Sequence, residues 1–163
     1  MRKFLSTIRF DESDARVFDV AAEAGDWAVS GAFQFGALDA DQIQGKVRQA
    51  FANGFLGLAS FGRSTFATVG EAEERDIAQI ERRLAEHLVA HYGAPSLQIA
   101  FPFAGEEIRY VLDLCQDVPI NTVFTVRRML DDKGRIKEEF RKIRPPSGEA
   151  QHARIWSGEP DPQ

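Results

Sequence analysis

The chain has 163 residues, of which 44% are hydrophobic and 28% are charged, and its formal net charge at pH 7 is −5. A chain of this length and composition is expected to form one domain whose core needs neither a disulfide nor a metal. The negative charge argues against nucleic acid as a partner, the lack of an apolar run near ~18 residues argues against a membrane span, and the single Cys115 suits a reducing compartment, so we expect a cytoplasmic protein.

The first 35 residues have a hydrophobic period of two, which is typical of strands whose alternate side chains face a core. This period predicts strands at residues 4–10 and 27–35. A third strand is expected at residues 17–22, between turns at residues 11–14 and 25–26. Together these strands predict an antiparallel three-stranded meander.

A short helix is expected next. Asp39 and Gln42 have the spacing of a capping box, and apolar residues then recur at helical spacing up to Asn53, where Gly54 provides a stop. The glycine-rich segment that follows leads into residues 65–69, which are β-branched enough to predict a short strand.

The longest predicted element is an amphipathic helix within residues 68–95. Its apolar residues recur at steps of three and four and form one stripe: Ile77, Ile80, Leu84, Leu88 and Tyr92. Thr68 and Glu71 have capping-box spacing, and Gly93 marks the end of the helix. Because charged residues cover the other faces, we expect the stripe to lie on a β layer drawn from both ends of the chain.

The region after this helix fits more than one structure. Residues 97–103 alternate, with Pro102 confining such a strand to a sheet edge. Residues 106–117 fit both a strand and a helix, and we favour the helix because it places Glu106, Arg109 and Asp113 on one side.

The C-terminal part predicts a hairpin followed by a tail. Residues 122–130 and 135–143 flank a turn at residues 131–134, after which the composition changes. We therefore expect a single α+β domain at residues 1–144 and an irregular tail at residues 145–163. Its sheet is largely antiparallel, built from the N-terminal meander and the C-terminal hairpin, and is packed on one face by the long central helix and two shorter helices.

The glycine-rich segment contains a candidate ligand site. Residues 57–64 have the spacing of a phosphate loop, but Arg63 replaces the lysine and the required order of strand, loop and helix is reversed. A weaker hypothesis is that Arg63 and Ser64 hold a small anionic ligand, with Glu106 or Glu107 as acid or base. The alternative, which we favour, is that Arg63 pairs with a surface carboxylate.

Metal and thiol chemistry find less support. His87 and His91 have the spacing of two metal ligands on a helix, but the residue after His87 is Leu88 rather than glutamate, and a core histidine is the favoured interpretation. Cys115 lies on the apolar side of its predicted helix, where a structural thiol is expected. We therefore predict no metal site and no cofactor, and assign no catalytic residue.

Two features near the C-terminus concern partners. The hairpin is locally basic, but its acidic residues are placed to neutralise the bases through cross-strand pairs, which is a stronger interpretation than nucleic-acid binding. Ile155 and Trp156 form a lone apolar pair in a tail rich in proline, glycine and acid. Such a pair either folds back over a groove or docks on another chain, so we predict that it binds a partner.

Three stretches carry a family resemblance: IRF at residues 8–10, RQAFANGFLGLASFGRSTF at residues 48–66, and DDKGRI with EEFRKIRP near the end. In these stretches the chain resembles a small family of uncharacterised bacterial proteins, a domain of unknown function. The similarity covers residues up to about Pro145, and it implies a compact cytoplasmic domain with no assigned activity.

The favoured function is a non-catalytic interaction module, either an accessory subunit or a homodimeric scaffold. This prediction rests on the absence of convergent catalytic groups, on the 13 phenylalanines and on the tail anchor. The alternative is a small-molecule binder or enzyme with a site for an anionic ligand near residues 54–65. A pocket lined by Arg63 and a carboxylate would favour the alternative, and an exposed apolar patch would favour the module.

Overall fold

The computed structural model describes residues 1–9, 11–36 and 38–143. The described strands are β1 (Arg2–Ile8), β2 (Trp27–Val29), β3 (Phe55–Gly57), β4 (Arg63–Ser64), β5 (Phe66–Ala72), β6 (Val123–Leu130) and β7 (Ile136–Ile143). The described α-helices are α1 (Ser13–Val17), α2 (Gly45–Asn53), α3 (Glu74–His91) and α4 (Leu97–Cys115), with short 3-10 turns at η1 (Ala32–Phe35) and η2 (Ala40–Gln42).

The strands form one antiparallel sheet in the order β4-β3-β2-β1-β5-β6-β7. The N-terminal strand β1 lies near the middle, where Leu5 pairs with Ala28 of β2 on one side and with Val69 of β5 on the other. The C-terminal hairpin β6–β7 extends the sheet beyond β5. The predicted α+β class is confirmed, with a sheet that joins strands from both ends of the chain.

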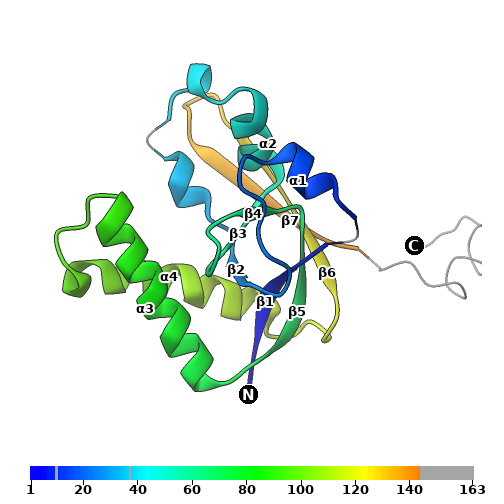
Figure 1. Cartoon of the computed structure of the whole chain (residues 1–163), viewed down its shortest axis with the longest axis vertical. Helices are drawn as coiled ribbons and strands as arrows, with labels where there is room; N and C mark the ends of the chain where they lie inside the picture. Colours follow the sequence, from blue (N-terminus) through cyan, green and yellow to red (C-terminus); the bar gives the residue numbers. More distant parts are fainter. Residues whose placement is uncertain (10, 37, 144–163) are drawn as a thin grey trace, which may run out of the picture.

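Two long helices cover one region of the sheet. α4 packs on β1 and β2, and α3 packs mainly against α4, so the predicted contact between the long helix and the β layer is partly relayed through a second helix (Figure 1). The core that joins these layers contains Leu5 from β1, Leu84 from α3 and Val111 from α4, each at most 1% exposed. The apolar stripe predicted for α3 therefore faces the core at Ile80 and Leu84, but its last member Tyr92 lies beyond the helix and is exposed.

The predicted N-terminal meander is wrong in two of its strands. Residues 13–17 form the helix α1, and the only pairing recorded for the predicted strand at 17–22 is an isolated bridge from Ala21 to Arg63. β2 ends at Val29, because Gly31 turns the chain in a left-handed conformation (φ 77°) and the 3-10 turn η1 follows. The apolar runs at residues 17–22 and 27–35 are too short for hydrophobic period alone to decide between strand and helix.

The long helix begins later than its sequence signal suggested. Thr68 and Glu71, the predicted capping box, lie in β5, and the actual box is formed by Glu73 and Asp76. The predicted end is confirmed, since Tyr92 terminates the helix and Gly93 follows with a φ of 77°. The pairing of β5 along the whole of β1 extends this strand to Ala72.

Residues 97–103 are helical, so the predicted edge strand is wrong. They form the first part of α4, which Ser96 caps by accepting a hydrogen bond from the backbone N–H of Ile99 at 3.2 Å. Pro102 lies inside the helix on its exposed side. The helix preferred for residues 106–117 is confirmed and belongs to the same element.

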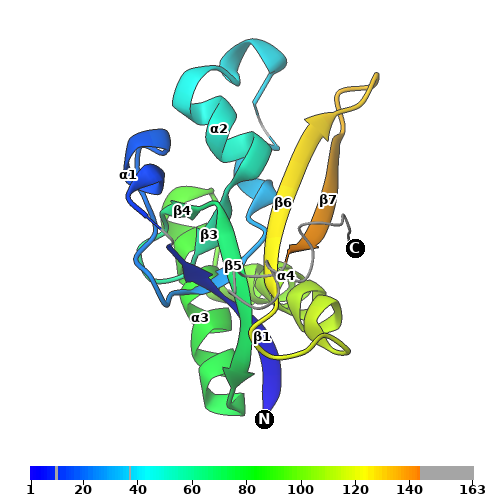
Figure 2. The same cartoon turned by 90° about the vertical axis from the view of Figure 1, so that its right-hand side faces the viewer.

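The helix expected at residues 39–53 is divided. Asp39 and Gln42 form the predicted capping box, but on the 3-10 turn η2, and α2 starts separately at Gly45, whose φ is 60°. α2 then packs along β6 (Figure 2). The hairpin is confirmed, with Gly134 in its turn at a φ of 77°.

Within the described residues, no helix is both long and apolar enough to cross a membrane. The tail predicted at residues 145–163 lies outside the part of the chain that the structure describes.

Candidate functional site

The predicted ligand cation Arg63 is buried and surrounded by backbone carbonyls. Its guanidinium donates hydrogen bonds to the carbonyl oxygens of Ser30, Gly54 and Gly31, at 3.4, 3.1 and 3.0 Å. It also donates to the side-chain oxygen of Gln34. No carboxylate of the described residues forms an ion pair with it. Arg63 thus holds chain segments together instead of pairing with a surface acid.

The neighbouring Ser64 is fully buried in β4. Its hydroxyl oxygen lies 2.8 Å from the carbonyl oxygen of Phe66 and 3.1 Å from that of Ile8. No hydrogen bond or ion pair among the described residues joins Arg63 or Ser64 to the predicted acid–base residues Glu106 and Glu107. Arg63 lines a pocket with Gln34 and Phe35, whereas Glu106 and Glu107 line a different one, so the structure does not gather the four residues into one site.

The sequence analysis did not single out Arg128, which is buried like Arg63 and also donates to backbone carbonyls. Its guanidinium donates to the carbonyl oxygens of Phe51 and Gly54, both at 2.9 Å, and forms an ion pair with Glu138 at 2.8 Å. These bonds cap the C-terminal carbonyls of α2 with a cation, where the helix dipole is negative. The signal was available, because Arg128 alternates with Val126 and Leu130 on the inward face of β6.

Arg63, Arg128, Phe35 and Glu138 form what we call the arginine cluster. The two guanidinium carbons lie 4.7 and 5.8 Å from the centre of the Phe35 ring. Burial, together with the positive charge of Arg128, lowers the pKa of Arg63 to about 9. Two buried cations next to one ion-paired carboxylate leave this part of an acidic protein locally positive.

Glu106 and Glu107 lie on α4, at one end of an apolar groove between α3 and α4. The groove encloses about 300 Å³ and is lined by Leu84 and Leu88 of α3, Ile99 and Phe103 of α4, and Phe33 of η1. Burial and the charge of Glu138 raise the pKa of Glu107, which forms no hydrogen bond or ion pair within the described residues. A carboxylate in this position favours the approach of a cation.

Large apolar side chains around the α3–α4 groove are left in solvent. Phe103 is 61% exposed, Ile99 49% and Tyr92 44%. The Tyr92 ring meets Phe33 edge to face, with centroids 5.5 Å apart, which closes one side of the groove. Exposed apolar residues scattered singly are ordinary, but these three lie around one cavity and form a concentrated apolar surface.

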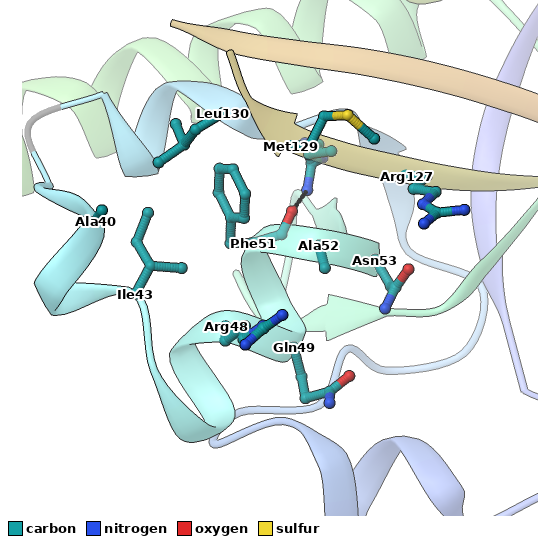
Figure 3. A pocket seen from close by; sticks show the side chains of 11 residues that line it. Ala40, Ile43, Arg48, Gln49, Phe51, Ala52, Asn53, Arg127, Met129 and Leu130 are labelled. Atoms are coloured by element: carbon teal, nitrogen blue, oxygen red, sulfur yellow. Dashed lines mark hydrogen bonds between the residues drawn. The ribbon is translucent and has the colours of Figure 1, made fainter. Parts of the chain in front are cut away.

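A second, larger pocket of about 660 Å³ lies between α2 and β6 (Figure 3). Arg48, Gln49 and Asn53 line it from α2, and Arg127 lines it from β6. The opposite end is apolar, with Ala40, Ile43 and Leu130 together in Figure 3. Neither strand register nor helix periodicity predicts this pocket, because it depends on how α2 docks beside the hairpin.

His87 and Cys115 lie in structural surroundings, whereas the prediction of a core histidine is wrong for His91, which is exposed at the end of α3. His87 stacks on Phe61 with ring centroids 3.7 Å apart, and burial lowers the pKa of His87. Burial raises the pKa of the Cys115 thiol to about 12, so the thiol is protonated at neutral pH. Among the described residues, no three His, Cys, Asp or Glu side chains lie together as a metal site would require.

The predicted cross-strand pairing of the hairpin's charges is confirmed for Arg128 and Glu138, which face each other in register. The other two ion pairs of the described hairpin are local: Asp131 pairs with Arg135 across the turn at 3.0 Å, and Glu139 pairs with Arg141 of the same strand at 3.2 Å. The predicted partner-binding residues Ile155 and Trp156 lie outside the described residues.

One comparison with known proteins identifies a family. The sequence model of the family DUF6505, described as a family of unknown function, matches residues 1–158 of the chain. No curated protein and no solved structure matches the chain. The match confirms the resemblance to a domain of unknown function, while the bacterial origin stays a prediction. It also extends past Pro145, where the similarity was expected to end, and includes Ile155 and Trp156.

Proposed function

The chain belongs to DUF6505, a family of unknown function, and we propose that it is a non-catalytic interaction module. Its binding surface is the α3–α4 groove, and the observation that carries the proposal is the exposure of Phe103, Ile99 and Tyr92 around one cavity. Covering such side chains releases about 25 cal/mol for each Å² of apolar surface removed from water.

The groove selects its occupant by shape and by charge. Leu84 and Leu88 offer an apolar floor, which suits one or two large hydrophobic side chains. Glu106 and Glu107 at the end of the groove form no hydrogen bond or ion pair in the described part of the chain, which suits a cation next to those side chains. The occupant is therefore a short segment with adjacent apolar residues beside a lysine or arginine.

The chain itself contains such a segment. Residues 154–156 read Arg154-Ile155-Trp156, which places a cation directly before two large apolar side chains. The family match includes these residues. We take this segment, supplied by a second copy, as the occupant of the groove, in keeping with the predicted homodimeric scaffold.

The test uses a fluorescein-labelled peptide of residues 150–160. It is titrated into the full chain carrying Ile155→Ser and Trp156→Ser, so that the chain's own segment does not compete, and fluorescence anisotropy is measured. We expect saturable binding, and its loss when Phe103→Asp or Ile99→Asp is added to that background.

Val89→Asp is the matched control, because Val89 is an exposed apolar residue of α3 that does not line the groove. Its binding should equal that of the parent protein. A peptide with Ile155 and Trp156 replaced by serine should not bind. Equal binding to the parent and to the Phe103→Asp variant would refute the proposal.

The alternative function, an anionic-ligand site at Arg63, has less support. The Arg63 guanidinium is occupied by carbonyl oxygens, and Glu106 and Glu107 face a different cavity.

A further inference from the structure

The α2–β6 pocket arises because β6 is longer than the strand beside it. β5 pairs with β6 only up to Thr125, so the rest of β6, to Leu130, has α2 as its neighbour on that side. A helix beside a strand cannot approach it as closely as a second hydrogen-bonded strand can. The space left between α2 and β6 is the pocket of about 660 Å³. Figure 2 shows α2 beside the projecting hairpin.

The lining of this pocket is positive in a protein whose net charge is −5. Arg48, Arg127 and Arg128 contribute to it, and no aspartate or glutamate of the described residues does. The side chains of Arg48 and Arg127 make no hydrogen bond or ion pair within the described residues, and both residues are exposed. A concave surface lined by one sign of charge concentrates counter-ions.

The cross-strand neighbour of Arg127 does not neutralise it. Glu139 pairs in register with Arg127, but its carboxylate binds Arg141 at 3.2 Å. Arg128 also lines the pocket, but its guanidinium donates to the carbonyl oxygen of Phe51, the bond drawn in Figure 3. Its charge is shared with Glu138. Arg48 and Arg127 are therefore the cations that remain available to a ligand.

The pocket is also polarised along its length. Figure 3 places Arg127 and Asn53 at one end and Ala40, Ile43 and Leu130 at the other. Arginine and amide groups donate hydrogen bonds to carboxylate or phosphate oxygens, whereas the other end offers only apolar contact. A ligand that satisfies both ends has an anionic head and a hydrocarbon body.

We propose that the α2–β6 pocket binds a small amphiphilic organic anion, with its carboxylate or phosphate between Arg48 and Arg127 and its hydrocarbon body toward Ile43 and Leu130. The site uses none of the four ligand residues predicted from the sequence and is separate from the α3–α4 groove. It therefore adds a ligand function that stands or falls independently of the interaction module.

Isothermal titration calorimetry of the full chain tests this site with three probes. Octanoate and octyl phosphate carry the two candidate heads, and octanol has the same body without a charge. We expect saturable binding of at least one anion, weakened by added NaCl, and no comparable binding of octanol. The stronger of the two anions identifies the head group.

Charge-removing variants locate the site. Arg48→Gln and Arg127→Gln should each weaken binding about tenfold, which corresponds to the loss of one charge-assisted hydrogen bond. Lys133→Gln, which removes an exposed cation in the turn of the same hairpin, is the control and should bind as the parent does, because Lys133 lies outside the pocket lining and forms no ion pair within the described residues. Unfolding midpoints recorded for all three variants establish that each is folded.

Three results would overturn the proposal. These are no saturable binding of either anion, binding of octanol as tight as that of the anions, or equal affinities in Arg127→Gln, Arg48→Gln and Lys133→Gln. None of these results depends on the peptide titration, so failure here leaves the interaction module standing.

Discussion

Replacing Arg128 by methionine should lower the free energy of unfolding strongly, although it changes the shape of the side chain little. Arg128→Met keeps most of the stem but removes a guanidinium that is buried with its residue 3% exposed. The substitution breaks the 2.8 Å ion pair to Glu138 and the two 2.9 Å bonds to the carbonyl oxygens of Phe51 and Gly54. It leaves the Glu138 carboxylate and the Phe51 carbonyl oxygen without this donor, while the Gly54 carbonyl oxygen keeps its bond from Arg63.

The magnitude follows from burial. Removing one partner of a buried ion pair costs about 3–5 kcal/mol, because the remaining charge is uncompensated. The Glu138 side chain is only 19% exposed, so water replaces the guanidinium poorly. Arg141→Met is the comparison, since Arg141 and Glu139 are 65% and 58% exposed. An exposed pair of this kind contributes about 0–1 kcal/mol.

Urea unfolding followed by circular dichroism at pH 7 measures both variants against the parent. We expect Arg128→Met to lower the free energy of unfolding by at least ~2 kcal/mol more than Arg141→Met. Adding Glu138→Met to Arg128→Met should restore part of the loss, because the unpaired carboxylate is then gone. Equal losses in the two single variants would refute the claim that the buried bonds of Arg128 to Glu138 and to the end of α2 stabilise the fold.

Three further predictions concern Gly31, Glu107 and Cys115. Gly25→Ala should lower the free energy of unfolding by ~1 kcal/mol, the strain of a left-handed alanine, because the space around Gly25 is open. Gly31→Ala should lower it by well over that amount, because the new Cβ would also lie 2.5 Å from the Cβ of Leu56. Urea unfolding midpoints of the two variants compare these losses. Glu107→Gln should raise the free energy of unfolding at pH 7, because burial raises the pKa of Glu107 and the folded protein therefore holds its charged form at a cost. This gain should shrink as the pH falls and vanish below 4.5, the ordinary pKa of glutamate, where the carboxyl group is protonated in both states. A gain that stays constant with pH would contradict this. Cys115 should react with a disulfide reagent at pH 8 only as fast as the protein opens, because burial raises its pKa to about 12, and a rapid reaction of the native protein would show an accessible thiolate.

The strongest periodic signals in the sequence were reliable. The apolar stripe of α3 is long enough to define a helix whatever surrounds it, and the turn at residues 131–134 specifies the hairpin β6–β7 through local geometry. The start of α3 was misplaced because Thr68 and Glu71 have cap-like spacing but are paired with Ser6 and Lys3 of β1. Sheet pairing overrides a weak local signal.

The first half of α4 was missed although a signal was present. Ala100, Ala104 and Ile108 recur every four residues and are buried, which continues through Pro102 into the helix favoured for residues 106–117. The larger apolar residues within 97–103 alternate with other residues, which suggested a strand and concealed this stripe of small side chains. Small residues let helices approach closely, so they mark a packed face as clearly as leucine does.

The candidate site shows a different limit. The sequence singled out Arg63 for its glycine-rich surroundings, but it could not show that backbone carbonyls of residues 30, 31 and 54 would surround the guanidinium. Those carbonyls come from two turns far apart in the chain. Glu106 and Glu107 were chosen as possible acid–base groups, and the structure places them at the end of an apolar groove.

By itself the sequence determined the elements whose periodicity or turn chemistry is complete within one stretch: the helix α3, the hairpin and the α+β class. The tertiary structure alone decided which strands neighbour β1, which arginines are buried, and where cavities remain. The physical reason is that periodicity and turn preference act between residues near in sequence, whereas burial, charge compensation and cavities depend on residues brought together from distant parts of the chain.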